Sequence, residues 1–222
     1  MKQIAIIITV SLLITFSGCS ERSRNNYDFD VVSSNVTVWE DSTGEFFIIL
    51  SLEVSNLSNA PLHFLESDFD IVDELGNLID TMRLVNAYPP IVNSDAIAVY
   101  YGVQISDRIS DASISLEAIP HIEAEKSRER GVSIGVIDTG RRMGEYTIGI
   151  VENFCFRTTY NDVNVAIVSR GSNNEVVSIK TAAIDSISPR EQVEFRAEYI
   201  LVQRDIGQEN APRREFFVYV TP

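Results

Sequence analysis

The chain has 222 residues, of which 32 are acidic and 18 are basic, so its formal net charge at pH 7 is −14. This acidic balance argues against a nucleic-acid partner, because binding to phosphates requires a basic face. The length allows one large domain or two small ones.

The chain opens with a short basic start followed by an apolar run. Met1 and Lys2 precede residues 4–14, which are apolar apart from Thr9 and Ser11. A stable membrane span needs about 20 apolar residues, whereas the core of a signal peptide has about 7–15. The run therefore predicts a signal peptide.

Small residues and a cysteine end this segment, in the stretch FSGCS. The stretch resembles the lipobox of bacterial lipoproteins, in which the cysteine receives a diacylglyceryl group and becomes the first residue of the mature chain. The resemblance implies a signal peptide at residues 1–18 and a lipid anchor on Cys19, which places the protein on the extracytoplasmic side of the cell membrane. Ser20 after the cysteine favours the outer membrane in an organism with two membranes. An ordinary secretory signal with an incidental cysteine is the alternative.

Polar residues follow the anchor at positions 19–30 and lack apolar periodicity, which predicts a flexible tether. With Cys19 lipidated, Cys155 would be the only other cysteine. No intramolecular disulfide could then form, and stability would depend on packed cores. Cys155 lies in VENFCF, which we interpret as a strand, where a lone thiol is most often a small buried side chain. A catalytic or metal-binding role is the alternative.

Beyond the tether, apolar residues alternate along short runs that are rich in β-branched and aromatic residues, as is typical of strands. Sequences such as DELGN and RGSNN separate the runs and predict turns. The best helix candidate, residues 122–131, has too few apolar residues to dock firmly. The pattern predicts an all-β protein. Its expected strands are residues 35–39, 46–54, 68–73, 96–105, 131–137, 146–152, 162–169, 176–184, 192–202 and 215–220.

The chain also repeats itself at a shift of 97 residues. Asn56 then falls on Asn153, and no gap is needed from residue 48 to residue 79. A one-residue adjustment places residues 94–99 on residues 190–195. The period matches an immunoglobulin-like sandwich of about 100 residues, although chance matching of apolar strands is the alternative. The domains expected from the repeat are residues 31–122 and 131–222, with a junction at residues 123–130.

Polar residues and glycines of the repeat have expected structural roles. Asn56 and Asn153 end core strands, where their side chains would satisfy loose backbone groups. Gly76 and Gly171 would supply the positive φ angles of two hairpins.

Two family resemblances lie on these motifs. Residues 31–119 carry a strand ending in V-x-N and the hairpin DFDIVDELG, and they resemble an immunoglobulin-like domain of unknown function common in bacterial surface lipoproteins. Residues 131–202 carry GIVEN and ISPRE and resemble the FxLYD family, although VAIVS at residues 165–169 replaces its name-giving segment. The resemblances imply two tandem immunoglobulin-like β-sandwich domains, and because the motifs are structural they imply little about function.

Candidate binding residues form two groups. Glu66, Asp68 and Asp70 alternate, so they share one strand face, and calcium takes six to eight oxygen ligands. A solvated edge is the alternative for this acidic group. Tyr88, Tyr100 and Tyr101 would form an aromatic binding surface, with core packing as the alternative.

Catalytic signatures are few. His63 and His121 have no Cys or His partner nearby in the sequence, although a zinc site needs three or four such ligands. The triplet at residues 138–140 resembles that of aspartic proteases, but we interpret it as a hairpin turn. We expect no cofactor.

The sequence therefore predicts a membrane-anchored extracytoplasmic lipoprotein that acts as a non-enzymatic binding or scaffolding module with a protein partner in the cell envelope. The first alternative is an accessory subunit that docks onto an envelope protein machine through its sheet edges. An enzyme is the second alternative.

Overall fold

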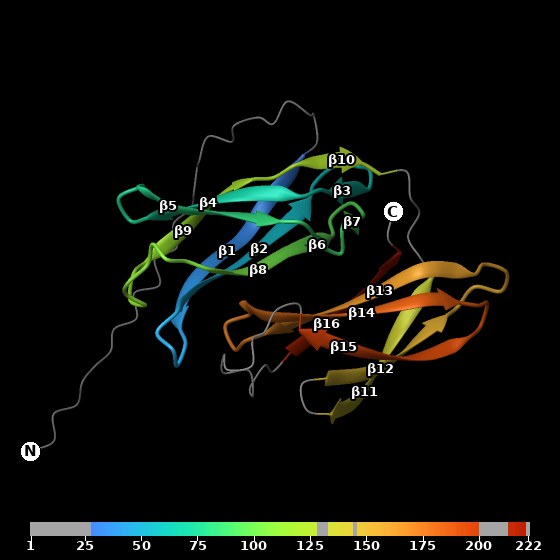
Figure 1. The fold of residues 1–222 in the computed structure, drawn as a ribbon. Helices are drawn as coiled ribbons and strands as arrows, with labels where there is room; N and C mark the ends of the chain where they lie inside the picture. The colour runs from blue at the N-terminus through green and yellow to red at the C-terminus, as the bar shows by residue number, and fades with distance from the viewer. Residues whose placement is uncertain (1–27, 128–132, 144–145, 200–212, 221–222) are drawn as a thin grey trace, which may run out of the picture.

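The computed structural model describes residues 28–127, 133–143, 146–199 and 213–220, and its regular elements are all β-strands (Figure 1). The all-β class predicted from the sequence is confirmed. This part of the chain contains no helix long and apolar enough to cross a membrane. The predicted signal peptide, Cys19 and most of the tether lie outside the described residues.

The N-terminal half, residues 28–127, folds into three small sheets with strand orders β1-β2-β8-β6, β5-β4-β9 and β10-β3-β7. Its strands are β1 (Phe29–Glu40), β2 (Phe46–Asn56), β3 (Leu62–Phe64), β4 (Ser67–Asp73), β5 (Leu78–Leu84), β6 (Ala87–Tyr88), β7 (Ile91–Val92), β8 (Ile97–Ile105), β9 (Leu116–His121) and β10 (Ala124–Lys126). Alternate residues of these strands point inward. They enclose one core that includes Leu50, Leu52, Phe64, Phe69 and Tyr100.

The C-terminal half, residues 133–220, forms one sheet of order β11-β12-β15-β14-β13-β16. Its strands are β11 (Ile134–Met143), β12 (Tyr146–Asn153), β13 (Tyr160–Arg170), β14 (Val176–Ile187), β15 (Gln192–Tyr199) and β16 (Arg213–Val220). Strands β14 and β15 pair at only two positions, so the sheet folds into two layers around a second core. That core includes Val151, Val163, Val165, Ile167 and Phe195.

The two halves share a strand plan. The order β1-β2-β8 corresponds to β11-β12-β15, and β5-β4-β9 corresponds to β14-β13-β16. Asn56 and Asn153 occupy the same place in this plan, since each ends its strand with a fully buried side chain. Tandem immunoglobulin-like domains are compatible with this plan, and the independence of the two halves stays a prediction.

The two asparagine side chains bind backbone groups at the strand ends, as the sequence predicted. The carboxamide nitrogen of Asn56 donates to the carbonyls of Ala60 and Val92, at 2.8 and 3.0 Å. That of Asn153 donates to Thr158 and Ile187, at 2.8 and 3.2 Å. Each side chain thus ties a strand end to the loop after it and to a distant strand.

The register of the repeat differs from the sequence prediction in the hairpins. The backbone bonds of the β4–β5 turn run from Asp73 to Asn77 and from Gly76 to Asp73. In the β13–β14 turn Asn174 takes the place of Gly76, at φ 67° against 79°. The predicted role of Gly171 is therefore wrong, and the gapless shift of 97 needs one inserted residue. With an uninterrupted shift of 97, residues of β13 that face the core would be matched with residues of β4 that face outward, because side chains alternate along a strand.

The register also differs before the strands β8 and β15. Asp95 and Arg190 both have positive φ, and each donates its backbone N–H to the equivalent asparagine carbonyl. The shift between the two halves there is two residues shorter than 97, whereas the sequence predicted a difference of one residue.

Strand β14 has no continuous counterpart. In the N-terminal half the same path is divided into β5, β6 and β7, with a cis peptide between Tyr88 and Pro89. The sequence did not predict these short strands, nor β3, β9 and β10. Residues 138–140 were also misread as a turn, since they lie inside β11 at a register irregularity.

Candidate functional site

The halves pack against each other through a third apolar cluster, which we call the joint. It contains residues of both halves: Tyr88, Val99, Tyr101, Ala166, Val168, Val176 and Ile179. The Tyr101 hydroxyl donates to the carbonyl of Val177 at 3.3 Å. The outer face of β8 therefore lies against β13 and β14 and is shielded from solvent.

The joint corrects the prediction of an exposed aromatic surface. Tyr100 and Tyr101 do point to opposite faces of β8, but the C-terminal half covers the outer face. Tyr100 lies in the N-terminal core, where its hydroxyl donates to the carbonyl of Leu65 at 2.8 Å and contacts Ser67 Oγ at 3.0 Å. Burial raises the pKa of Tyr100 to about 12. Tyr88 is 7% exposed, so none of the three side chains forms an exposed surface.

A charged cluster lies beside the joint. The guanidinium of Arg170 pairs with Glu53 of the other half through Nη2 and with Glu215 through Nε, the latter at 3.1 Å. Its third donor, Nη1, meets the carbonyl of Asn174 at 2.9 Å. The side chains of Arg170 and Glu53 are 5% and 8% exposed. Ser33 donates to the second carboxylate oxygen of Glu53 at 2.7 Å.

The electrostatics of this cluster favour ionised groups. Burial alone would lower the pKa of Arg170, but hydrogen bonds to Glu53 and Glu215 outweigh burial and raise it. A buried charge is stable only when it is paired and hydrogen-bonded, and both conditions hold for Arg170. The cluster therefore ties β2 of one half to β13 and β16 of the other.

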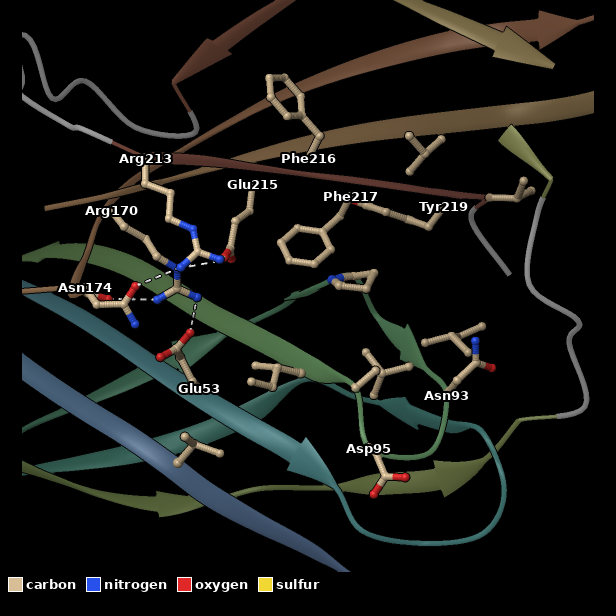
Figure 2. Close-up of a pocket in the computed structure, with 18 residues that line it drawn as sticks. Glu53, Asn93, Asp95, Arg170, Asn174, Arg213, Glu215, Phe216, Phe217 and Tyr219 are labelled. Atoms are coloured by element: carbon tan, nitrogen blue, oxygen red, sulfur yellow. Dashed lines mark hydrogen bonds and ion pairs between the residues drawn. The ribbon is translucent and has the colours of Figure 1, made fainter. Parts of the chain in front are cut away.

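A cleft of about 870 Å³ opens between the halves next to this cluster (Figure 2). One wall is β16, and the facing wall comes from Pro89, β7, the loop before β8 and the first residue of β8. The described residues that line it are Val32, Glu53, Pro89, Ile91, Val92, Asn93, Asp95, Ala96, Ile97, Arg170, Asn174, Arg213, Glu215, Phe216, Phe217, Val218, Tyr219 and Val220.

The lining combines charged and apolar side chains. Of its three carboxylates, Glu53 and Glu215 pair with Arg170, whereas Asp95 lies apart from this pair (Figure 2). None of the described lining residues is a serine, threonine, cysteine, histidine or lysine. The second arginine, Arg213, pairs with Glu215 at 2.8 Å and is 64% exposed.

The acidic group proposed for calcium lies elsewhere. Glu66, Asp68 and Asp70 share one face as predicted, but two basic side chains of the same half contact them. Arg83 pairs with Glu66 and lies 3.7 Å from Asp68, and His121 Nε2 lies 2.9 Å from Asp70. The hydrogen bond from His121 lowers the pKa of Asp70. Across the described part of the chain, no group of three His, Cys, Asp or Glu side chains is arranged to hold a metal ion.

The other sequence candidates form local contacts. His63 lies 3.2 Å from Glu125 on the neighbouring strand. Cys155 follows β12 in a loop, so its predicted strand position is wrong, and its side chain is half-buried instead of buried. Its N–H donates to Asn153 Oδ1 at 2.9 Å, as that of Ser58 does to Asn56. Cys155 thus occupies the place that Ser58 has in the N-terminal half.

The comparisons with known protein families and with curated proteins give no match for this chain. The resemblances to the lipoprotein immunoglobulin-like domain and to the FxLYD family therefore remain predictions.

The joint and the charged cluster were not predicted from the sequence. The stretch FFIILSLEV does indicate a covered outer face, because a strand that is apolar on both faces is buried on both faces. Glu53 interrupts that run, and Arg170 ends the similar run VNVAIVSR. A charge inside a doubly buried strand needs a partner, but the sequence does not say which one.

Proposed function

We propose that the protein is a lipid-anchored extracytoplasmic module that binds a protein partner of the cell envelope without catalysing a reaction. The observation that carries the binding role is the cleft between the halves, whose walls come from both halves. Its apolar middle and charged ends provide recognition groups for a partner.

The joint supports this role because it holds the cleft walls together. Glu53 and Arg170 connect the halves at one end of the cleft, and the buried side chains of Tyr101 and Val168 connect them beside it. A pre-organised site loses less entropy on binding than one that must first assemble. Such a cleft fits a binding or scaffolding module.

The location rests on the sequence around Cys19. An apolar run of signal-peptide length, small residues and a cysteine followed by a polar stretch support lipid attachment. Two acyl chains on one cysteine give stable anchoring, since each buried CH₂ contributes about 0.8 kcal/mol.

Cell fractionation tests the location. Cys19→Ala should release the protein from membranes or leave it unprocessed, and it should abolish labelling with radioactive palmitate. Cys155→Ala is the matched control and should stay in the detergent phase. A Cys19→Ala protein that partitions like the parent would contradict the anchor.

Site-specific cross-linking in intact cells tests the binding role. A photoreactive amino acid at Phe217, inside the cleft, should give a discrete protein adduct. The same group at Leu75, on the β4–β5 hairpin and 86% exposed, is the control. Equal adducts from both positions, or none from Phe217, would contradict a partner in the cleft.

A further inference from the structure

Strand β16 has one unpaired edge within the described structure. It is the last strand in the order β11-β12-β15-β14-β13-β16 and pairs with β13 alone, from Arg213 opposite Arg170 to Val220 opposite Val163. In such a ladder, every second residue of an edge strand directs its N–H and C=O away from the sheet. A row of backbone donors and acceptors therefore lies along β16 between Glu215 and Val220.

The cleft follows this edge. Consecutive residues from Glu215 to Val220 line it, although neighbouring side chains of a strand point to opposite faces. Figure 2 shows Phe217 and Tyr219 directed toward the N-terminal half and Phe216 directed the other way. A cavity touches both sets of side chains only where it runs along the strand's edge, so the unpaired backbone groups border it.

The C-terminal core is incomplete on this side. Phe216, Val218 and Val220 pack against that core but are only partly buried. On the next strand, Val163 and Val165 are fully buried. An added strand along β16 would cover the exposed parts of these side chains and satisfy the backbone groups at the same time.

We propose that the edge of β16 accepts an extended segment of the partner protein as an additional β-strand, and that this segment alternates apolar with basic or small polar residues. This proposal rests on the proposed binding function and specifies its partner chemistry. Backbone hydrogen bonds to β16 supply part of the affinity, and pockets for alternate side chains supply the specificity.

The walls define which side chains fit. The apolar set of side chains would pack beside Phe216 and Val218, and the basic or small polar set would face the opposite wall near Asp95 and Ile97. A strand places its side chains on two faces in this way. A ligand whose side chains do not alternate between two faces would contact only one of the two walls.

Charge selects a basic segment. Glu53 and Glu215 are paired with the two arginines of the lining, so Asp95 is the lining carboxylate left for a partner. Asp95 is exposed and lies away from the Arg213 end of the cleft (Figure 2). Lysine or arginine in the added strand would pair with Asp95, and the formal charge of −14 on the whole chain would repel an acidic segment.

The test uses the full-length lipidated protein in detergent and an eight-residue fluorescent peptide, as long as β16, in which valine alternates with lysine and threonine. Anisotropy should show saturable binding, and hydrogen exchange should slow at the amides of residues 213–220. N-methylation of alternate peptide bonds should weaken binding about tenfold or more, because backbone hydrogen bonds are lost. Replacing lysine by glutamate should weaken it similarly.

Protein variants locate the site. Phe217→Lys on one wall and Ile97→Lys on the other should each weaken binding by repelling the basic peptide, while Leu75→Lys on the exposed hairpin should leave it unchanged. Circular dichroism verifies folding, and Ile97→Lys keeps the test valid if Phe217→Lys does not fold. The absence of binding, equal binding of the N-methylated peptide, or protection away from β16 would each overturn strand addition.

The result is separable from the proposed function. If Phe217 cross-links a partner in cells and the N-methylated peptide binds as well as its parent, the binding module stands and strand addition fails. If the peptide binds as expected and Cys19→Ala stays membrane-bound, strand addition stands and the lipid anchor fails.

Discussion

The N-terminal half encloses large aromatic side chains, whereas the C-terminal half is packed mainly with β-branched ones. Phe69 and Tyr100 are fully buried, and their rings meet edge to face at 5.4 Å. In the C-terminal core Ile167 holds the place of Phe69, and Phe195 holds the place of Tyr100, while most of the other core side chains are valine or isoleucine. One strand plan and one buried asparagine thus accommodate two different core compositions, as expected when polar anchors set the chain path and apolar residues fill the volume.

The halves also differ in how regular their strands are. The path that β14 follows without interruption is broken in the N-terminal half near Tyr88 and Pro89. The broken segment supplies Tyr88 to the joint and Ile91 to the cleft. The cleft thus combines an irregular wall from one half with a regular edge strand from the other.

The largest loss of stability is expected when one charge of the pair that connects the halves is removed. Arg170→Met should cost about 3–5 kcal/mol of unfolding free energy, because Glu53 stays buried without a counter-charge. Urea unfolding followed by tryptophan fluorescence and circular dichroism would measure the loss.

The double variant Glu53→Leu/Arg170→Met is the matched control and should regain much of this stability, since no isolated charge remains. If the single and double variants are equally unstable, the cluster matters through packing and not through charge.

The equivalence of the two asparagines gives the next effect. Asn56→Ala and Asn153→Ala should each cost about 2–3 kcal/mol, because each leaves several buried backbone groups without partners. Thermal unfolding would compare them with Asn77→Ala in the exposed hairpin. If only one of the two substitutions lowers the stability, the equivalent asparagines contribute unequally to the free energy of unfolding.

Tyr100 should make the stability of the N-terminal half depend on pH in the alkaline range. Its pKa is raised from 10.0 to about 12, so the neutral phenol favours the folded state. Its contribution should be complete below pH 10 and decline as the pH rises from 10 toward 12. Tyr100→Phe should cost about 1–2 kcal/mol at pH 7 through the lost hydrogen bond and should reduce this alkaline loss.

Burial also raises the pKa values of Tyr88 and Tyr219, so the alkaline loss should shrink in Tyr100→Phe without disappearing. An unchanged profile of unfolding free energy against pH would contradict the assignment to Tyr100.

The smallest change in stability is expected at a position where the two halves already carry different residues. Cys155→Ser reproduces the equivalent Ser58, so it should change stability by less than about 1 kcal/mol and keep the fold and partner binding. Differential scanning calorimetry and the cross-linking assay would check this. Loss of binding in the folded variant would assign the thiol a chemical role.

Alternating patterns indicated most of the long strands, because burial of one face leaves a period of two in the sequence. The Asn56–Asn153 match also predicted a shared geometry. The offset at Asn174 was hidden because asparagine and glycine both tolerate positive φ. The cleft was hidden as well, since Glu53 and Arg170 are far apart in sequence and meet only through packing of the halves.

The proposed anchor at Cys19 gives strand β1 a mechanical consequence. The strand begins at Phe29 opposite Asn56 and pairs with β2 to Glu40 opposite Phe46, with one register irregularity between Val31 and Ser33. Tension from the N-terminus pulls along β1, while its ladder hydrogen bonds run across the strands. The load is then shared in shear over many bonds instead of opening them one at a time, so detachment of β1 by force should require most of the ladder to fail together.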